Sequence, residues 1–170
     1  MKIYITGVSG TGKTTTAEKL REKGIHTIDL DGVPGLCRWV HAETKEVHRW
    51  HPGIGQEFLD THEYICDRAM LIELMGNHER VVVVGLTDNW LEIKDLFDKV
   101  FLFRCAEEVF LSRVRDRTNH DFGKDEAEQE MILGWYKEFE EEMLDAGAIS
   151  IDASQPTDHI VRQLLQELGS

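Results

Sequence analysis

Short apolar runs alternate with stretches of helical periodicity along this chain, and that order predicts its fold. Residues Val81-Val82-Val83-Val84 form a continuous β-branched run, as expected for a strand buried on both faces. The stretches between such runs place apolar residues at helical spacing. Strands that alternate with helices indicate a parallel sheet covered on both sides, that is, a three-layer α/β fold. The predicted strands are 2–6, 26–30, 80–86, 99–104 and 148–152.

The elements predict one domain over residues 1–170, without internal repeats or a linker. The interval 32–79, between the second and third predicted strands, is too long for one crossover helix. We therefore expect a helical insertion there. Ligands of open α/β sheets bind beyond the carboxyl ends of the strands, so this insertion would overhang that edge and bind an acceptor molecule.

A glycine-rich loop between the first strand and the first helix fits the phosphate-loop pattern GxxxxGK[ST]. Its glycines let backbone N–H groups turn toward a polyphosphate, and the helix N-terminus adds a positive dipole end. Lys13 can reach the β- and γ-phosphates, and the Thr14 hydroxyl can ligate Mg²⁺. The pattern predicts a nucleoside triphosphate site formed by Gly7, Val8, Ser9, Gly10, Thr11, Gly12, Lys13, Thr14 and Thr15.

Two aspartates end the second predicted strand. Asp29 and Asp31 are two residues apart, so both can point toward the phosphate site. One carboxylate can hold Mg²⁺ through water, and the other can accept a proton from an attacking hydroxyl. The alternative is that Asp31-Gly32 forms a simple turn and that Asp29 caps a neighbouring backbone group.

The third predicted strand ends in Thr87 and Asp88. Asp88 can contact the acceptor or a metal, or it can be the N-cap of a short helix that begins near Trp90. The apolar run itself carries no aspartate. Metal binding is therefore expected to fall to Asp29 and Asp31.

Arg113 and Arg117 lie four residues apart on one predicted helix face, before a polar loop that ends at Lys124. Such a pair can clamp a γ-phosphate when a lid closes and excludes water. We expect residues 113–124 to form that lid. Pairing of these arginines with nearby glutamates is the alternative.

The histidines of the insertion allow several interpretations. His48, His51 and His62 lie near Glu57, which invites a zinc hypothesis, but the spacing fits no compact structural site. The same side chains can instead line an acceptor pocket or have a structural role.

Composition excludes some function classes. The formal charge of −13 argues against a nucleic-acid partner, which needs a basic face. No apolar run approaches the length of a membrane span, so no membrane partner is expected. The three cysteines form no CxxC pair, which indicates reduced thiols and a cytoplasmic location.

Together, the phosphate loop, the Asp-x-Asp pair, the Arg113/Arg117 spacing and the segment Ile151–Pro156 resemble the small P-loop kinases, the group of adenylate, shikimate and gluconate kinases. The resemblance implies a five-stranded parallel sheet in the order 2-3-1-4-5, a mobile lid and ATP with Mg²⁺ as donor. It also implies that Arg113 flanks the adenine or the phosphates and that Arg117 approaches the transferred phosphate. By the same resemblance, the base would be bordered by Ser154, Gln155 and Pro156, while Asp29 serves the metal and Asp31 the acceptor hydroxyl.

The resulting expectation is an ATP-dependent kinase of a small hydroxyl-bearing metabolite, a monomer or a homodimer. A nucleoside-monophosphate kinase is the alternative enzyme. Thr87-Asp88-Asn89-Trp90 stands where adenylate kinases carry Asp-Gly-Phe-Pro-Arg, which weakens that alternative. A GTP-dependent switch is a different class, but the chain lacks the Asn-Lys-x-Asp motif that reads guanine. A nucleotide-binding NTPase without a transfer acceptor remains a further alternative.

Overall fold

The computed structural model describes residues 1–51, 53–116 and 126–169. Its central sheet has five parallel strands in the order β2-β6-β1-β7-β8. Counted along the chain, this is the predicted order 2-3-1-4-5, so the predicted α/β fold is confirmed. The strands are β1 (Lys2–Thr6), β2 (His26–Asp29), β6 (Val81–Val84), β7 (Lys99–Arg104) and β8 (Ile149–Asp152).

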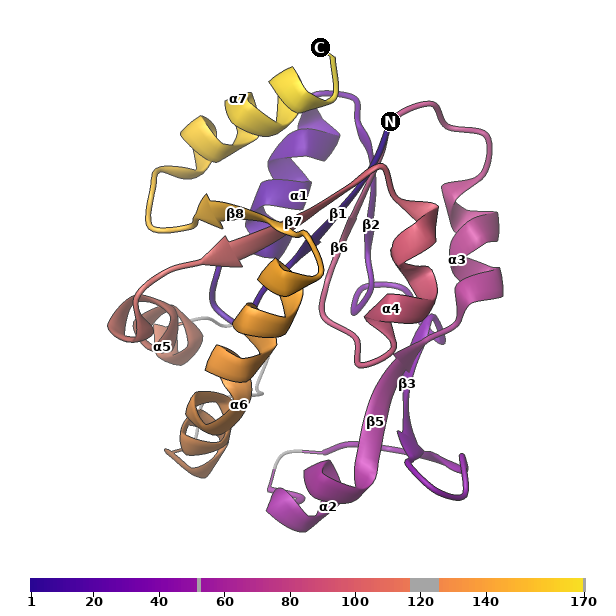
Figure 1. The fold of residues 1–170 in the computed structure, drawn as a ribbon, viewed down its shortest axis with the longest axis vertical. Coiled ribbons are helices and arrows are strands. Elements are labelled where there is room, and N and C mark those ends of the chain that lie inside the picture. Colours follow the sequence, from indigo (N-terminus) through magenta and orange to yellow (C-terminus); the bar gives the residue numbers. More distant parts are fainter. Residues whose placement is uncertain (52, 117–125, 170) are drawn as a thin grey trace.

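Helices cover both faces of this sheet (Figure 1). Helices α1 (Lys13–Glu22) and α7 (Thr157–Glu167) pack on the face that receives Ile3 and Ile5. The opposite face receives Tyr4, and it is covered by α3 (Arg68–Met75), α4 (Trp90–Ile93) and α6 (Glu126–Asp145). Alternate side chains of a strand point to opposite faces, which is why the all-valine β6 is buried on both.

A third, smaller apolar cluster joins α5 (Glu107–Asp116) to α6. In it, Phe110 and Ile132 pack against Val8 of the glycine-rich loop. A 3₁₀ turn, η1 (Lys94–Leu96), links α4 to β7. None of the helices in the described ranges has the length and apolar character that a membrane span requires.

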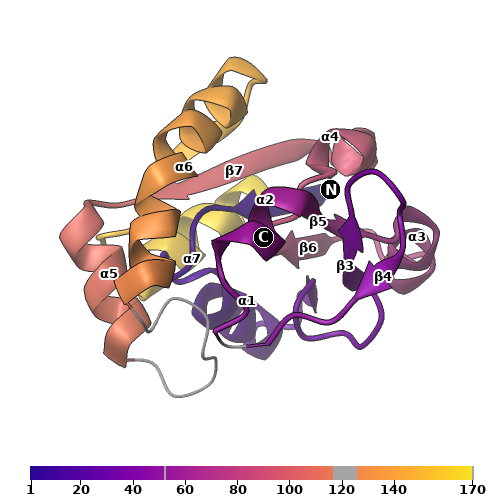
Figure 2. The same cartoon turned by 90° about the horizontal axis from the view of Figure 1, so that it is seen from below.

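The insertion after β2 differs from the expectation. Within residues 32–79 it contains helices α2 (Gln56–Thr61) and α3, but also an antiparallel sheet in the order β4-β3-β5, formed by β3 (Cys37–His41), β4 (Val47–His48) and β5 (His62–Cys66). The prediction of a helical insertion was therefore incomplete, because it missed this sheet. The physical reason is a period of two, because Cys37, Trp39 and His41 share one face of β3 while buried Val40 lies on the other. Viewed from below, this sheet and α2 lie over the carboxyl ends of the central strands (Figure 2).

Candidate active site

The glycine-rich loop lies between β1 and α1, packed tightly on one side and open on the other. Gly10 has a φ of 85°, and a Cβ there would lie 2.4 Å from the carbonyl oxygen of Phe110. A Cβ on Gly7 would similarly lie 2.5 Å from the carbonyl oxygen of Phe103. At Gly12, by contrast, the Cβ position has no atom within 4 Å. The outer side of the loop therefore leaves space for a ligand.

Lys13 and the first turn of α1 give this open side a positive character. The Lys13 ammonium lies over the loop and donates to the carbonyl oxygens of Gly7 (2.6 Å) and Val8 (3.0 Å). The Thr11 hydroxyl closes the turn on the same Val8 carbonyl at 2.8 Å. Unpaired N–H groups at a helix start and a nearby ammonium form an anion site, so the predicted residues fit a polyphosphate.

Thr14 and Asp29 form a pair of oxygen ligands beside Lys13. The Thr14 hydroxyl donates to the Asp29 carboxylate at 2.8 Å, although 15 residues separate them in sequence. The other Asp29 oxygen accepts the backbone N–H of Asp31 at 3.1 Å, which fixes the carboxylate. Mg²⁺ is usually held by one or two carboxylates together with substrate phosphates and water, and this pair fits that donor set.

Asp31 lies beyond Asp29 and is held by the insertion. The Tyr64 hydroxyl, from β5, donates to the Asp31 carboxylate at 2.9 Å. Desolvation and the negative charge of Asp31 raise the pKa of Tyr64 above its usual value. Tyr64 therefore stays protonated and keeps donating to Asp31, which itself lines the cavity described next.

A cavity of about 1420 Å³ connects the glycine-rich loop to the insertion. Ser9, Lys13 and Asp31 line its phosphate end. Its remaining walls come from the insertion on one side and from α4 and α6 on the other, and Figure 1 shows these elements flanking the carboxyl edge of the sheet. Aromatic side chains line both walls, namely Trp39, Trp50, Tyr64, Trp90, Trp135 and Phe139.

The end of β6 is joined to the insertion through Asp88. Its carboxylate accepts the backbone N–H of Tyr64 at 2.5 Å, and its own N–H donates to the Tyr64 carbonyl at 2.9 Å. Helix α4 has Asn89 at its N-cap, so Asp88 is not that cap. The side chain lies at the cavity wall, where desolvation raises its pKa.

Two of the histidines of the insertion, His48 and His62, lie at the cavity. Rings of His48 and His62 share a hydrogen bond of 2.7 Å between Nδ1 and Nε2, and both residues line the cavity. Within the described ranges, no group of three or more His, Cys, Asp or Glu side chains is arranged to hold a metal ion. The structure thus places these two rings at the insertion side of the cavity.

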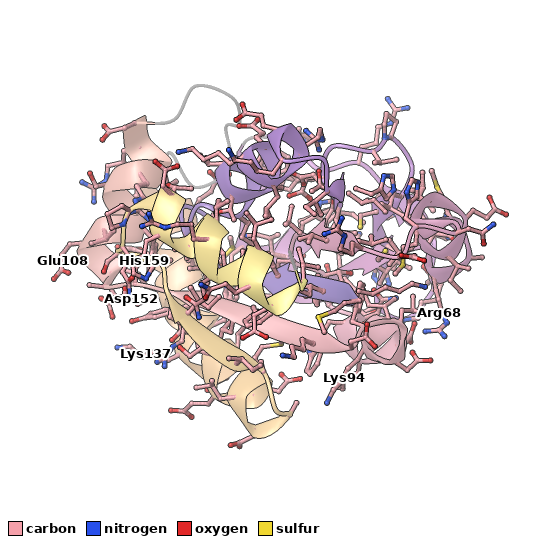
Figure 3. All side chains as sticks on the ribbon, turned by 90° about the horizontal axis from the view of Figure 1, so that it is seen from above. Arg68, Lys94, Glu108, Lys137, Asp152 and His159 are labelled. Carbon is pink, nitrogen blue, oxygen red and sulfur yellow. The ribbon has the colours of Figure 1, made fainter. Side chains whose placement is uncertain are left out.

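Arg113 contacts the segment that follows β8. The Arg113 guanidinium donates to the carbonyl oxygen of Ala153 at 2.9 Å. Asp152, labelled in Figure 3, accepts hydrogen bonds from the Ser154 hydroxyl and from the Ser154 N–H at 2.9 Å. These two bonds, the hydroxyl bond first, lower the pKa of Asp152. Residues Ser154–Pro156 therefore form a fixed turn beside Arg113. Arg117 and most of the predicted lid lie outside the described residues.

Sequence reasoning missed the contribution of α6. Its apolar residues recur at helical spacing, which is typical of core packing, and Ile132, Tyr136 and Met143 are indeed buried. Trp135 and Phe139, however, are only half-buried and line the cavity. The available signal was an apolar stripe wider than packing on one sheet face requires.

Comparisons with known proteins agree with this geometry. The AAA domain family matches residues 3–134, while no curated protein matches the chain.

Among solved structures, a deoxyadenosine kinase from M. mycoides has a TM-score of 0.62 at 17% identity, covering 99% of both chains. A shikimate kinase from Acinetobacter baumannii has a TM-score of 0.62 at 16% identity, covering 98% of this chain and 92% of that one. A gluconokinase from Sinorhizobium meliloti has a TM-score of 0.54 at 20% identity, covering 99% and 91% respectively. The chain therefore belongs to the AAA domain family, and its fold is that of the small P-loop kinases.

Proposed function

We propose that this protein is an ATP- and Mg²⁺-dependent kinase that transfers the γ-phosphoryl group to a hydroxyl of a small metabolite. The supporting observation is the line of groups from Lys13, through the Thr14–Asp29 pair, to Asp31 at the mouth of a cavity of about 1420 Å³. Phosphate-binding, metal-binding and proton-accepting groups then follow one another in the order that in-line transfer needs.

Each of these residues has a separate role in the proposed reaction. Lys13 and the amides of the loop bind the phosphates and offset the negative charge that spreads over the transferred group. Thr14 and Asp29 would hold Mg²⁺, which would supply additional neutralisation of the phosphate oxygens when bound. Asp31 orients the acceptor hydroxyl and takes up its proton at the carboxylate oxygen not bonded to Tyr64. The cavity walls position the acceptor and exclude water.

The charges of the cavity favour an acceptor without a phosphate of its own. Among the described residues that line it, seven are carboxylates: Asp31, Asp60, Glu63, Asp88, Glu130, Glu138 and Glu142. Only Lys13, Arg38 and Arg49 are cations, and Lys13 belongs to the donor site. Like charges near a phosphate raise the cost of binding it, so this balance disfavours the nucleoside-monophosphate alternative.

Replacing Lys13 tests the donor site. Lys13→Ala should lower turnover by about a thousandfold, because charge stabilisation in the transition state is lost. Its thermal unfolding should stay close to that of the parent protein, since Lys13 is half-buried at the loop surface and no core side chain is removed. The measurement is ADP release in the presence of Mg²⁺ and an acceptor panel. Parent-like turnover by this variant would refute the assignment of Lys13.

The acceptor panel separates the two enzyme classes. It contains nucleoside monophosphates, nucleosides, sugar acids and neutral hydroxyl compounds, and phosphorylated products are identified by mass. We expect turnover with compounds that carry no phosphate. Substantial turnover with a monophosphate would establish the alternative instead. Tight ATP binding by calorimetry without any phosphorylated product would point to a nucleotide-binding protein without transfer.

A further inference from the structure

Two cysteines that are far apart in sequence face each other in the insertion. Cys37 of β3 pairs directly with Cys66 of β5 in the antiparallel ladder. The neighbouring pair is hydrogen-bonded, since the Asp67 N–H donates to the Leu36 carbonyl at 2.8 Å. Such pairs alternate along a ladder, so Cys37 and Cys66 occupy a non-hydrogen-bonded position. Cα atoms at such positions are about 4.5 Å apart, within the range that a disulfide spans.

Other contacts hold this pair in place. The backbone N–H and carbonyl of Cys66 turn away from β3 and bind the Asn89 side chain, at 2.9 Å and 3.1 Å. Directly opposed residues of a ladder place their side chains on the same face, so the two thiols are neighbours. The interaction with Cys37 lowers the pKa of Cys66. The backbone is therefore already arranged for a bond between the two sulfurs.

Small molecules can reach the pair from one side. Cys37 is half-buried and lines the large cavity, whereas Cys66 is only 3% exposed. Cys105, the third cysteine, packs against the apolar cluster beneath α1 and α7 and against the cluster that joins α5 to α6. It therefore lies away from the insertion. The reactive unit is thus the pair, and its entrance is the acceptor cavity.

We propose that Cys37 and Cys66 are a modification site at which a small thiol oxidant, such as hydrogen peroxide, forms a reversible cross-strand disulfide. Both S–H bonds break and one S–S bond forms. The two electrons and two protons pass to the peroxide, which becomes two molecules of water. A dithiol reductant reverses the step by thiol–disulfide exchange. This proposal does not depend on the kinase assignment.

The position of the pair connects it to the acceptor wall. Cys37 and Trp39 share one face of β3, and Cys66 and Tyr64 share the matching face of β5. The rings of Trp39 and Tyr64 are in contact, with centroids 5.1 Å apart, and Tyr64 holds Asp31. Oxidation would therefore join β3 to β5 covalently beside Trp39 and Tyr64, which line the cavity.

Thiol counting on the intact protein tests the proposal. The reduced full-length chain is treated with a small excess of hydrogen peroxide, denatured, and titrated for free thiols. We expect the count to fall from three to one, the mass to fall by two hydrogens, and peptide mapping to join Cys37 to Cys66. Dithiothreitol should restore all three thiols. Because the cross-link restricts the unfolded chain, the melting temperature of the oxidised form should rise by about 5 °C.

Three variants serve as controls. Cys105→Ser should lose both of its remaining thiols, whereas Cys37→Ser and Cys66→Ser should show neither the mass loss nor the higher melting temperature. Calorimetry should give the same ATP affinity for reduced and oxidised protein, because the glycine-rich loop lies outside the cross-link. A thiol count that stays at three would overturn the proposal. So would loss of thiols through added oxygen atoms or through bonds to Cys105.

Discussion

At the scale of single residues, the candidate chemistry depends on contacts that the sequence separation hides. Thr14 meets Asp29 across 15 residues, and Tyr64 meets Asp31 across 33. The first contact could be anticipated, because a phosphate loop and the end of the neighbouring strand share the carboxyl edge of a parallel sheet. The second could not, because it requires knowing how the insertion folds back. In the proposed reaction, Tyr64 is therefore expected to position Asp31, and only the structure reveals this contact.

Tyr64→Phe isolates that positioning role. Without the hydroxyl, the Asp31 carboxylate loses its bond of 2.9 Å and its fixed orientation. We expect kcat to fall by about tenfold with little change in the KM for ATP, because a neutral hydrogen bond to a charged group contributes about 1.5 kcal/mol or more. Steady-state kinetics with an accepted substrate measures both constants. An unchanged kcat, or a loss confined to KM for ATP, would contradict the role.

Asp88 predicts a pH dependence of stability. Its pKa is raised in the folded state above the ordinary value of 3.8, so folding favours the protonated carboxyl. The favourable contribution is complete below the ordinary value, and it is lost as pH rises from there through the raised pKa. Asp88→Asn keeps an acceptor for the Tyr64 N–H but does not ionise. Relative to the parent protein, this variant should therefore gain stability as pH rises through that window.

Thermal unfolding at closely spaced pH values checks this expectation. The difference in melting temperature between Asp88→Asn and the parent protein should grow upward from about pH 4 and then become constant. Parallel curves for the two proteins would show that desolvation of Asp88 is unimportant for folding.

At the scale of elements, helix α6 both packs in the core and lines the cavity. Its sequence does not distinguish the residues that serve each purpose. One side packs on the sheet through Met143 and on α5 through Ile132, while Trp135 faces the cavity. An ion pair also attaches α6 to the sheet: the Arg104 guanidinium, at the end of β7, donates to Glu140 at 2.7 Å. Glu140 is only 7% exposed, so removal of Arg104 would leave a buried carboxylate without this ion-pair partner.

The substitution Arg104→Met tests how much the ion pair with Glu140 contributes to stability. The variant keeps an apolar stem but leaves the carboxylate of Glu140 without its partner, which should destabilise the protein by about 2 kcal/mol. Urea denaturation followed by circular dichroism gives the free energy of unfolding. The double variant Arg104→Met with Glu140→Leu should recover most of the loss. A double variant as unstable as the single one would mean that packing of the Arg104 stem, and not the unpaired charge, is responsible.

At the scale of the whole molecule, the cavity exists only because distant parts of the chain meet over the sheet edge. The insertion supplies Trp39 and Tyr64, α6 supplies Trp135, and the glycine-rich loop supplies Lys13. This arrangement predicts that donor and acceptor affinities are separable. Substitutions in the walls formed by the insertion and α6 should change the affinity for the acceptor alone. The reason is that only the end of the cavity near Lys13 is expected to contact both substrates.

Trp135→Ala tests this separation. Removing the ring takes away a large contact surface on the acceptor wall, so the KM for the acceptor should rise by about tenfold. ATP affinity measured by calorimetry with Mg²⁺ should stay within about twofold of the parent value, because Trp135 lies on α6 and not in the glycine-rich loop. Lys13→Ala is the matched control, since it should weaken the donor side instead. A similar loss of affinity for ATP and for the acceptor in Trp135→Ala would contradict the prediction that the two affinities are separable.

The sequence supported some of this picture better than the rest. Strand order and the phosphate site follow from short-range rules, because a parallel sheet and a glycine-rich turn have few alternatives. The insertion was harder, since β4 has two residues and its pairing depends on partners outside its own segment. Cys37 and Cys66 show the same limit. No local spacing signals them, and they meet only through the register of β3 on β5.

The close approach of Gly10 to α5 has a consequence for anyone who exchanges parts between related enzymes. With the Cβ position only 2.4 Å from the Phe110 carbonyl, the helix that carries Arg113 rests directly on the turn that follows β1. A chimera that imports one of the two pieces alone would place mismatched surfaces in contact. The two pieces should therefore be transplanted together, as one cassette.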